Sequence, residues 1–437
     1  MDNPARPTRV RYLMIAVTTL VAIMLYVDRV CLSILGEQIK PLLDDSPELQ
    51  KERFDDLLSA FFWAYALFQL PAGWLGDRYG PRLMLALYLF FWSCCTGLMG
   101  LADGFAMLFV LRLGCGMFEA GAYPLAAGIV RKWTPFATRA FASGAVAVGG
   151  RLGGAIAPPL TVWLAAGSVD GWRQPFFVYG LVGMVGAVVF YFWFRNRPDQ
   201  HPVVNAAEAT LIQGDTPVTV ATRVKFPPLR GFVESRALWL NSLVQFLANF
   251  AWVFIITQFP SFLKEVYQTP EAQRATYQSY AIYAGIVGML FGGWLSDRLV
   301  KRFGLRWGRA MPVAGSRLVV GGAYLVCLTL HDPLEVTLMM CLVAMATDMG
   351  VAPVWAYGQD VGGKYVGAVI GWANMWGNFG AALAPMVLGR IRLRFDDPTD
   401  PSVGWNVAFL VCACTQVVAA LAALGIDSSR PLRGTDQ

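Results

Sequence analysis

Charged residues lie inside stretches of the sequence that are otherwise apolar. Asp28 and Arg29 are neighbours in one such stretch, and Glu119 lies in another. An ionised side chain at the centre of a membrane-spanning helix costs at least about 2.5–3.5 kcal/mol on insertion scales, so such residues usually pair or line a cavity. A guanidinium stays charged when buried and presents a planar fork that matches a carboxylate. Arg29 is therefore predicted to bind the carboxylate of a substrate. The alternative is a structural ion pair with Asp28 or another carboxylate.

Asp28 and Glu119 are predicted to exchange protons. Burial favours the neutral form of a carboxyl group, whereas a neighbouring arginine favours the ionised form, so the balance can fall near the working pH. Protonation of the two carboxylates would release Arg29 for an incoming anion. In the alternative interpretation Glu119 only pairs with Arg112, which lies two turns away on the same helix face. Both histidines of the chain lie in expected loops.

Arg151 and Asp348 are a further pair of charges inside apolar stretches. Either Arg151 contacts a second anionic group of the substrate, or it pairs with Asp348 across the two halves. Arg112 and Asp348 are interpreted as members of an ion-pair network. The structural pair is the favoured interpretation. Arg317 follows the expected start of its helix by only about two turns, so its side chain is predicted to extend to the cytoplasmic surface.

Polar and aromatic residues in the apolar stretches are candidates for reading a hydroxylated substrate. An amide suits a polyhydroxy chain because it offers a donor and an acceptor at once. Hydrogen bonding between helices is the alternative role for each of them. The candidates are Tyr65, Gln69, Gln245, Trp355, Asn374 and Asn378.

The elements that must position these residues are membrane-spanning helices. The chain has 437 residues, of which 56% are hydrophobic and 15% charged, whereas soluble domains carry roughly 25% charged residues. The apolar runs are continuous and close to the roughly 20 residues that a spanning helix needs, so helices rather than barrel strands are expected. The predicted fold is an all-α membrane protein whose twelve helices cover 12–36, 54–76, 82–101, 105–130, 139–167, 174–194, 237–263, 274–296, 309–330, 334–357, 364–389 and 404–425.

The distribution of basic residues predicts the orientation of the chain. The net charge is +6, and Lys and Arg gather in alternate loops, for example Arg298, Lys301, Arg302 and Arg306. By the positive-inside rule these loops and both termini face the cytoplasm. The charge thus indicates orientation in the inner membrane and no nucleic-acid partner. The eight cysteines lie in apolar runs and are interpreted as small core residues.

Internal repetition predicts two pseudo-symmetric six-helix bundles. GWLGDRYGPR at 73–82 matches GWLSDRLVKR at 293–302, and GRLGGAIAP at 150–158 matches GNFGAALAP at 377–385. The polar stretch between the repeats lacks a sustained apolar period, as is typical of a linker. The predicted domains are an N-terminal bundle (1–194), a cytoplasmic linker (195–236) and a C-terminal bundle (237–437).

The repeated loop is expected to act as a latch between the two halves. An aspartate beside helix ends and arginines can form ion pairs that break when the halves rock, and small residues allow close approach of helices. The alternative is a plain cytoplasmic anchor. The latch candidates are Gly73, Asp77, Arg78, Arg82, Asp297 and Arg298.

The loop Gly73-x3-Asp77-Arg78-x-Gly80-x-Arg82 resembles the signature loop of the major facilitator superfamily. Three further motifs resemble its anion:cation symporter branch, which includes galactonate and hexuronate transporters and vesicular glutamate and sialic acid carriers: YVDR at 26–29, YALFQLP at 65–71 and R-x3-G-x2-EA-x3-P at 112–124. The resemblance implies parallel repeats and places Arg29 where sugar-acid symporters hold their anion. It likewise matches sugar-acid contacts to Tyr65, Gln245, Trp355 and Asn374.

The expected function is proton-coupled symport of a small organic anion, a sugar acid or a similar carboxylate, by alternating access in the lipid bilayer. Antiport of organophosphates or dicarboxylates is the alternative within transport, and a non-transporting membrane sensor is the alternative of another class. The sequence shows neither a metal cluster nor a nucleophile–base spacing. We therefore expect no enzyme, cofactor or metal, and a monomer.

Overall fold

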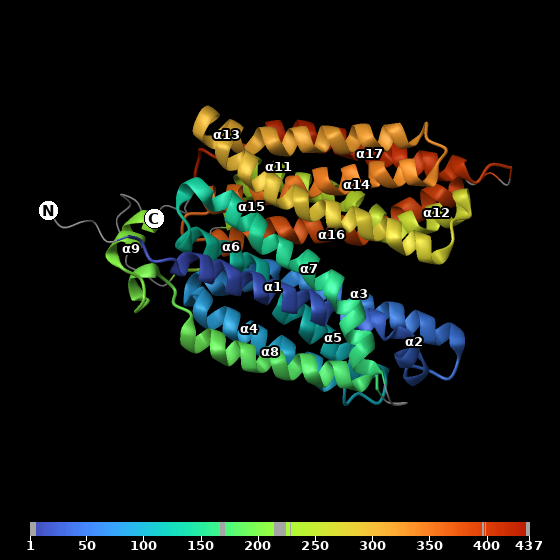
Figure 1. Cartoon of the computed structure of the whole chain (residues 1–437), viewed down its shortest axis with the longest axis horizontal. Helices are drawn as coiled ribbons and strands as arrows, with labels where there is room; N and C mark the ends of the chain where they lie inside the picture. Colours follow the sequence, from blue (N-terminus) through green and yellow to red (C-terminus); the bar gives the residue numbers. More distant parts are fainter. Residues whose placement is uncertain are drawn as a thin grey trace. The chain divides into compact units, whose positions relative to one another are not determined.

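The computed structural model describes residues 6–166, 171–213, 224–227, 229–395, 397 and 399–433. Within this part of the chain the regular structure is helical and contains no strand. The expected all-α architecture is confirmed. Figure 1 shows the helices as long rods.

The chain forms two compact units. The first contains residues 1–227 and 362–371, and the second contains 228–361 and 372–437. The described linker residues 195–213 and 224–227 thus belong to the first unit, as do the opening residues of the helix that begins at Val366. The predicted division at 194 and 236 stays a prediction.

The helices of the first unit are α1 (Val10–Ile34), α2 (Gly36–Ile39), α3 (Pro47–Tyr79), α4 (Pro81–Met99), α5 (Phe105–Glu119), α6 (Ala122–Trp133), α7 (Arg139–Ala165), α8 (Arg173–Trp193) and α9 (Ala206–Gln213), with 3₁₀ turns at Lys40–Leu42, Phe136–Thr138 and Pro198–Gln200. Within this unit α1 packs along α7 and α4 along α8 (Figure 1). A side chain on Gly149 or Gly153 of α7 would overlap the backbone of α1, so glycine is what permits this close approach.

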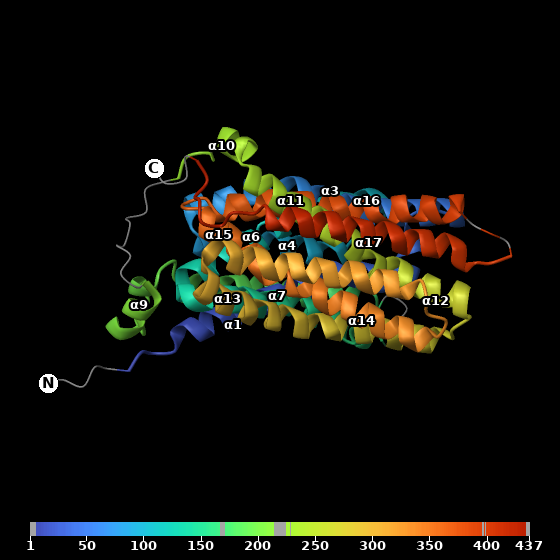
Figure 2. The ribbon, with the colours of Figure 1, turned by 90° about the horizontal axis from the view of Figure 1, so that it is seen from above.

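The helices of the second unit are α10 (Leu229–Glu234), α11 (Arg236–Val253), α12 (Phe259–Tyr267), α13 (Glu271–Cys327), α14 (Pro333–Met349), α15 (Val351–Val361), α16 (Val366–Arg394) and α17 (Ser402–Leu424). A π-helical turn, Phe254–Gln258, joins α11 to α12. Figure 2 shows α13 beside α14, with which it packs closely. The core of this unit contains a cluster of aromatic rings that includes Phe254, Tyr324, Trp405 and Phe409.

The twelve predicted spans all coincide with helices, but their boundaries differ from the prediction. In the described residues, nine helical runs are long and apolar enough to cross a membrane. One of these runs lies in α13, which is two helices joined at Gly304, where φ is 75°. The remaining predicted spans, 54–76 and 364–389, lie in the long helices α3 and α16. Large apolar side chains that remain exposed, such as Trp163 at 72% and Phe192 at 68%, suit contact with lipid.

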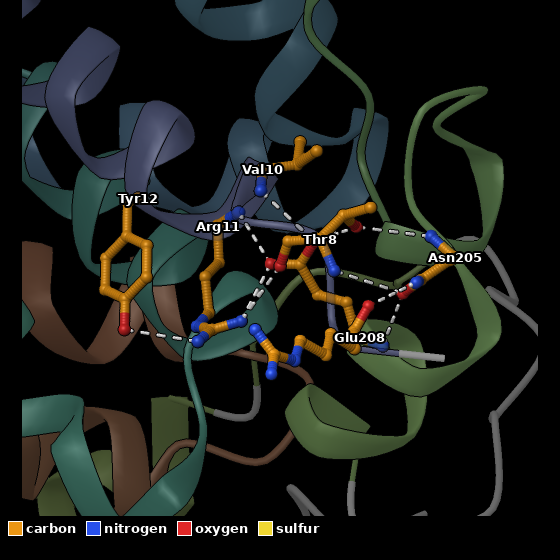
Figure 3. Close-up of polar contacts among 7 residues, drawn as sticks. Thr8, Val10, Arg11, Tyr12, Asn205 and Glu208 are labelled. Carbon is orange, nitrogen blue, oxygen red and sulfur yellow. Dashed lines mark hydrogen bonds and ion pairs between the residues drawn. The ribbon is translucent and has the colours of Figure 1, made fainter. Parts of the chain in front are cut away.

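The first helix receives its N-terminal cap from the linker (Figure 3). The backbone N–H groups of Val10 and Arg11 donate to the Glu208 carboxylate over 3.1 Å each, and the Arg11 guanidinium donates to it over 2.9 Å. The Thr8 hydroxyl also donates to Glu208, and the Thr8 N–H donates to the Asn205 side chain over 3.2 Å. Glu208 is fully buried. An acidic group at this position satisfies the free N–H groups of the first turn and complements the helix dipole.

Substitution of Glu208 by alanine should loosen the start of α1. Each buried donor left without its partner costs about 1–3 kcal/mol, so the amides of Val10 and Arg11 should exchange hydrogen faster and the unfolding midpoint should fall. The control is Asp199→Ala, which removes a surface pair with Arg197 that is worth about 0–1 kcal/mol. Equal exchange at Val10 in the wild type and the Glu208 variant would contradict this role of the linker.

His201 docks the linker against two tryptophans. Its ring lies 6.0 Å from that of Trp133 and 5.7 Å from that of Trp193, in edge-to-face geometry. The indole of Trp133 also donates to the carbonyl of Arg195 over 3.1 Å. Burial lowers the pKa of His201, and the nearby Arg195 lowers it further, while Glu208 opposes the shift. The docked linker therefore favours the neutral imidazole.

Docking through His201 should weaken in acid. Because the pKa of His201 is lowered on docking, its contribution to stability is complete above about pH 6.5 and is lost as the pH falls through the lower pKa of the docked state. The NMR titration of labelled histidine in a His331→Gln variant, where His201 alone remains, should give a midpoint below 6.5. Trp193→Leu should return the midpoint toward 6.5. A wild-type midpoint at or above that value would refute the docking effect.

Candidate functional site

Arg29 and Glu119 form a buried ion pair in the first unit. Glu119 is the last residue of α5, and Arg29 lies in the second half of α1. The Nε and Nη2 atoms of Arg29 donate to one Glu119 oxygen over 3.2 and 3.1 Å. The Glu119 side chain is 1% exposed and that of Arg29 is 12% exposed. A charge-assisted contact of this kind is far stronger in an apolar environment than in water.

Three aromatic rings surround the Arg29 guanidinium. Its central carbon lies 4.4 Å from the ring centroid of Tyr65 and 5.0 Å from those of Tyr26 and Phe61. Cation–π contacts stabilise a guanidinium without neutralising it. The rings therefore hold Arg29 in place whether its carboxylate partner is Glu119 or another anion. Tyr65 is thus brought to Arg29, as expected for a shared site.

Arg112 lies close to this pair but contacts different groups. Its Nε donates to the carbonyl of Leu57 over 3.3 Å, and its guanidinium lies 4.5 Å from the centroid of the Phe61 ring, the same ring that Arg29 contacts. Within the described residues Glu119 pairs with Arg29 and not with Arg112. The seven-residue spacing places Glu119 and Arg112 on one face of α5, but the Arg112 side chain turns toward the backbone of α3.

Asp28 faces away from Arg29. The indole of Trp92 on α4 donates to its carboxyl oxygen over 2.9 Å, and Asp28 is 6% exposed. Consecutive helical residues point about 100° apart, so α1 directs Asp28 toward α4 and Arg29 toward the end of α5. The sequence analysis did not identify Trp92 as a site residue. The signal available for it was only a tryptophan in an apolar run.

The amide of Gln69 is buried without a hydrogen-bond partner among the described residues. Gln69 is fully buried on α3, and neither its amide oxygen nor its amide nitrogen has a hydrogen-bond partner among the described residues. Such a group is rare in a folded protein and suits a position that a ligand or water fills.

Arg151 lies on α7 in the first unit and Asp348 on α14 in the second. Their predicted pair stays a prediction.

The substrate candidates of the second unit lie mostly on α11 and α16. Asn378 donates to the carbonyl of Asn374 over 2.8 Å. A side chain on Gly377 would meet Gln245 and Asn249 of α11, so these amides lie beside that part of α16. Trp355 is buried on α15. The structure thus places four residues with amide side chains in one region of the second unit, and amides suit a ligand rich in hydroxyl groups.

Arg317 does not extend to the surface, so that prediction was wrong. Its side chain is 2% exposed, and its Nη2 donates to the carbonyl of Thr347 over 2.8 Å. The second part of α13 follows directly from Gly304 rather than starting at 309, which places Arg317 about 20 Å along it. At that depth the side chain meets the end of α14, where Asp348 is 1% exposed.

The predicted latch residues of the first loop contact helix ends and rings. The Asp77 carboxylate accepts hydrogen bonds from the N–H groups of Gly367 and Ala368, in the first turn of α16, over 2.9 and 2.8 Å. Arg82 donates to the carbonyl of Tyr191 over 2.7 Å. In the described residues Asp77 thus binds a helix N-terminus instead of an arginine, because free N–H groups and the helix dipole attract a carboxylate.

Two further latch candidates of this loop, Gly73 and Arg78, contact a helix end and aromatic rings respectively. A side chain on Gly73 would overlap the backbone of Gly367, so this glycine permits the contact of Asp77 with α16. Arg78 stacks on the rings of Trp74 and Tyr79, at 5.5 and 5.3 Å.

The second loop forms a different network around Arg309, which is the first residue of the predicted span 309–330 and was not selected as a site residue. Arg309 is 1% exposed. It donates to Asp297 over 3.0 Å and to Asp360 over 3.0 Å. Arg298 lies exposed over Trp294, at 5.7 Å from the ring centroid. The sequence repeat therefore does not produce equal contacts in the two loops.

Substitution of Asp77 by alanine should release the first turn of α16. A hydrogen bond to a charged group contributes about 1.5–3 kcal/mol, so exchange of the Gly367 and Ala368 amides should accelerate by about tenfold or more. The control is Asp297→Ala, which should affect the surroundings of Arg309 and leave these two amides unchanged. Unaltered exchange at Gly367 in the Asp77 variant would show that the contact contributes nothing.

Comparison with known proteins identifies the family to which this chain belongs. A family model described as Major Facilitator Superfamily matches residues 12–385. The probable sulfoacetate transporter SauU of Cupriavidus necator is 31% identical over 428 residues, which cover 96% of this chain and 94% of the relative. The D-galactonate transporter of Escherichia coli is 30% identical over 409 residues, which cover 89% of this chain and 90% of the relative.

A solved structure shares the fold. The crystal structure of FucP, a major facilitator transporter in the outward conformation, matches with a TM-score of 0.72 at 14% identity and covers 95% of this chain and 99% of its own. At that identity the likeness concerns the fold alone. The family match, the relatives and the helical architecture agree. This chain belongs to the Major Facilitator Superfamily, in its branch of organic-anion transporters, and is a multi-pass membrane transporter of organic acids rather than an enzyme.

Proposed function

We propose that this transporter carries a small organic anion together with protons, by alternating access. The observation that carries the proposal is the Arg29–Glu119 pair, a permanent cation whose partner is a buried carboxylate that can be protonated. A substrate carboxylate and Glu119 would then compete for one guanidinium. Protonation of Glu119 frees Arg29 for the anion and removes a negative charge that would repel it.

Arg112 extends the same argument. Its guanidinium lies against the same Phe61 ring as that of Arg29, and among the described residues it forms no ion pair with a carboxylate within 4.0 Å. With Glu119 protonated, two cations would face one site. Such a site favours the binding of an anionic group, and a second acidic group on the substrate would add to the affinity.

The substrate is proposed to be a sugar acid or a similar small carboxylate. The relatives named above carry sulfoacetate and D-galactonate according to their names. Arg29 would bind the acidic group, with Tyr65, Gln69 and Arg151 beside it. Gln245, Trp355, Asn374 and Asn378 would read the hydroxyl groups, because amides offer both a donor and an acceptor.

Asp28 is proposed to hold a proton of its own. It is buried, and the single group that hydrogen-bonds to its carboxyl among the described residues is the uncharged indole of Trp92. A buried carboxylate without a cationic partner is costly, so protonation is the less expensive state in this arrangement. Asp28 and Glu119 would therefore load protons in different surroundings.

The remaining parts of the proposal concern the setting of the transporter. We infer that both termini face the cytoplasm in the inner membrane, that the protein works as a monomer, and that 195–236 links two bundles formed by 1–194 and 237–437. The excess of basic residues in alternate loops supports this orientation. The Asp77 contact with α16 would act as a latch in the transport cycle.

Uptake into proteoliposomes tests the proposal. Purified protein should accumulate labelled D-galactonate, D-glucarate or sulfoacetate when the outside is made acidic, and less without the gradient. Glu119→Gln and Asp28→Asn should lose the stimulation by the gradient. Arg29→Lys, which lacks the planar fork, should raise KM by about tenfold or more because it weakens a charge-assisted contact worth about 1.5–3 kcal/mol.

Glu52→Gln is the matched control for the coupling variants. Glu52 has the same chemistry but is exposed near the start of α3, so its substitution should leave uptake and its pH response unchanged. Full stimulation by the gradient in both Glu119→Gln and Asp28→Asn would refute proton coupling through these residues. Uptake of none of the three acids would refute the substrate class.

A further inference from the structure

The first turn of α1 borders an open concavity of about 500 Å³ that is rich in arginine. The residues that line it are Arg6, Pro7, Arg9, Arg11 and Tyr12. Arg29, at the proposed transport site, lies about 27 Å farther along α1 than Arg11, at 1.5 Å per residue. The concavity is therefore separate from that site. Guanidinium groups gathered around a hollow suit an anion with several oxygen atoms, because each presents a fork of N–H donors.

The concavity carries an excess of positive charge. Glu208 forms an ion pair with Arg11 over 2.9 Å, and it is fully buried against the backbone of the first turn. Arg6 and Arg9 are exposed, and neither forms an ion pair with a carboxylate of the described residues. Three guanidinium groups against one carboxylate leave positive charge that a bound anion can neutralise.

The linker fixes the segment that carries these arginines (Figure 3). The side-chain amide of Asn205 donates to the carbonyl of Arg6 over 2.8 Å, and its backbone N–H donates to the Thr8 hydroxyl over 3.3 Å. Glu208 holds the N–H groups of Val10 and Arg11. The backbone that presents the arginines is thus ordered before a ligand arrives, which lowers the entropic cost of binding.

Tyr12 joins the basic concavity to an apolar surface. Arg11 donates through Nη2 to the Tyr12 hydroxyl over 3.1 Å, and its guanidinium lies 4.5 Å from the centroid of the Tyr12 ring (Figure 3). The Tyr12 residue is 61% exposed. Tyrosine, which has an apolar ring and a polar hydroxyl, is enriched where a membrane meets water. The concavity therefore lies at the level of the lipid headgroups.

An exposed apolar stripe continues from Tyr12 along α1. Leu13 and Leu20 are 50% and 54% exposed, and Ala16 between them is exposed as well. Residues three and four positions apart share one face of a helix. Leu20 precedes Arg29 by about two and a half turns, so the stripe lies on the opposite side of α1 from Arg29. It thus faces away from the transport site and suits contact with an acyl chain.

We propose that the concavity binds the phosphate headgroup of an anionic phospholipid, whose acyl chain lies along the stripe of Tyr12, Leu13 and Leu20. Arg6 and Arg9 would bind the phosphate oxygens, while Arg11 stays paired with Glu208. In the orientation proposed above, this lipid belongs to the cytoplasmic leaflet, whose surface is negatively charged.

The apolar stripe favours a lipid over a soluble anion. A free phosphate would contact the arginines alone and leave the exposed leucines in place. A phospholipid neutralises the arginines and also covers apolar surface beside them, so two favourable contributions add. Continuity between the basic concavity and the stripe is what selects this occupant.

Native mass spectrometry of the full-length protein in detergent tests the site. The wild type should bind its first phosphatidylglycerol at a concentration lower by about tenfold or more than that needed for phosphatidylcholine, whose headgroup has no net charge. The double variant Arg6→Gln, Arg9→Gln should lose this preference, since each arginine near a lipid surface contributes about fivefold in affinity.

The matched control is the double variant Lys301→Gln, Arg302→Gln. It removes two exposed basic residues of another loop and lowers the net charge by the same amount, so the preference for phosphatidylglycerol should persist. An equal loss in the control would overturn the proposal, because the preference would then come from the overall charge. Equal binding of the two lipids by the wild type would overturn it as well.

Two further measurements test the lipid and the linker separately. Inorganic phosphate in millimolar excess should leave phosphatidylglycerol bound, and its displacement would overturn the assignment to a lipid. Asn205→Ala keeps the arginines but frees the carbonyl of Arg6, so it should weaken binding less than the Arg6→Gln, Arg9→Gln variant. Unchanged binding would refute the part of the linker. Lipid binding is measured without substrate or gradient, so it stands or fails independently of the proposed transport.

Discussion

A buried cation needs an acceptor within reach, and this constraint governs how the arginines of this transporter are placed. Arg29 meets Glu119 among three aromatic rings, and Arg309 meets two carboxylates at the end of α15. Arg317 meets a carbonyl at the end of α14. Because desolvation of one unpaired charge costs more than a complete pair, each of these contacts ties together helices that are distant in sequence. The same dependence makes the packing responsive to protonation of a carboxylate.

The fold supplies these acceptors through irregular positions in its helices. Glu119, which pairs with Arg29, is the last residue of α5, and Arg317 donates to the carbonyl of Thr347 near the end of α14. Glycines serve the same purpose: Gly73 allows the Asp77 carboxylate to reach the N-terminus of α16. Several of these polar contacts therefore lie at helix ends, whereas Asp28 and Arg29 lie within the regular part of α1.

The linker shows the same principle outside the membrane helices. Its composition indicated a polar connection, yet the described part of it is docked on the first unit through His201 and Glu208. The Glu208 carboxylate of α9 caps the first turn of α1, where Arg9 provides no side-chain cap, and the Asn205 amide just before α9 binds Thr8. No local pattern predicts this contact, because its partners are separated by nearly the whole first unit in sequence.

The amino-acid sequence by itself determined the positions of the helices, since apolar runs of the right length can satisfy their backbone only as helices in lipid. It also selected Asp28, Arg29 and Glu119, because charge in an apolar run is rare and costly. Only the tertiary structure decided which charges meet: Asp28 turns to Trp92, Glu119 to Arg29, and Arg317 inward rather than to the surface. The reason is geometric. Partner choice depends on where a helix starts, bends and stops, and shifts of a few residues rotate a side chain to another face.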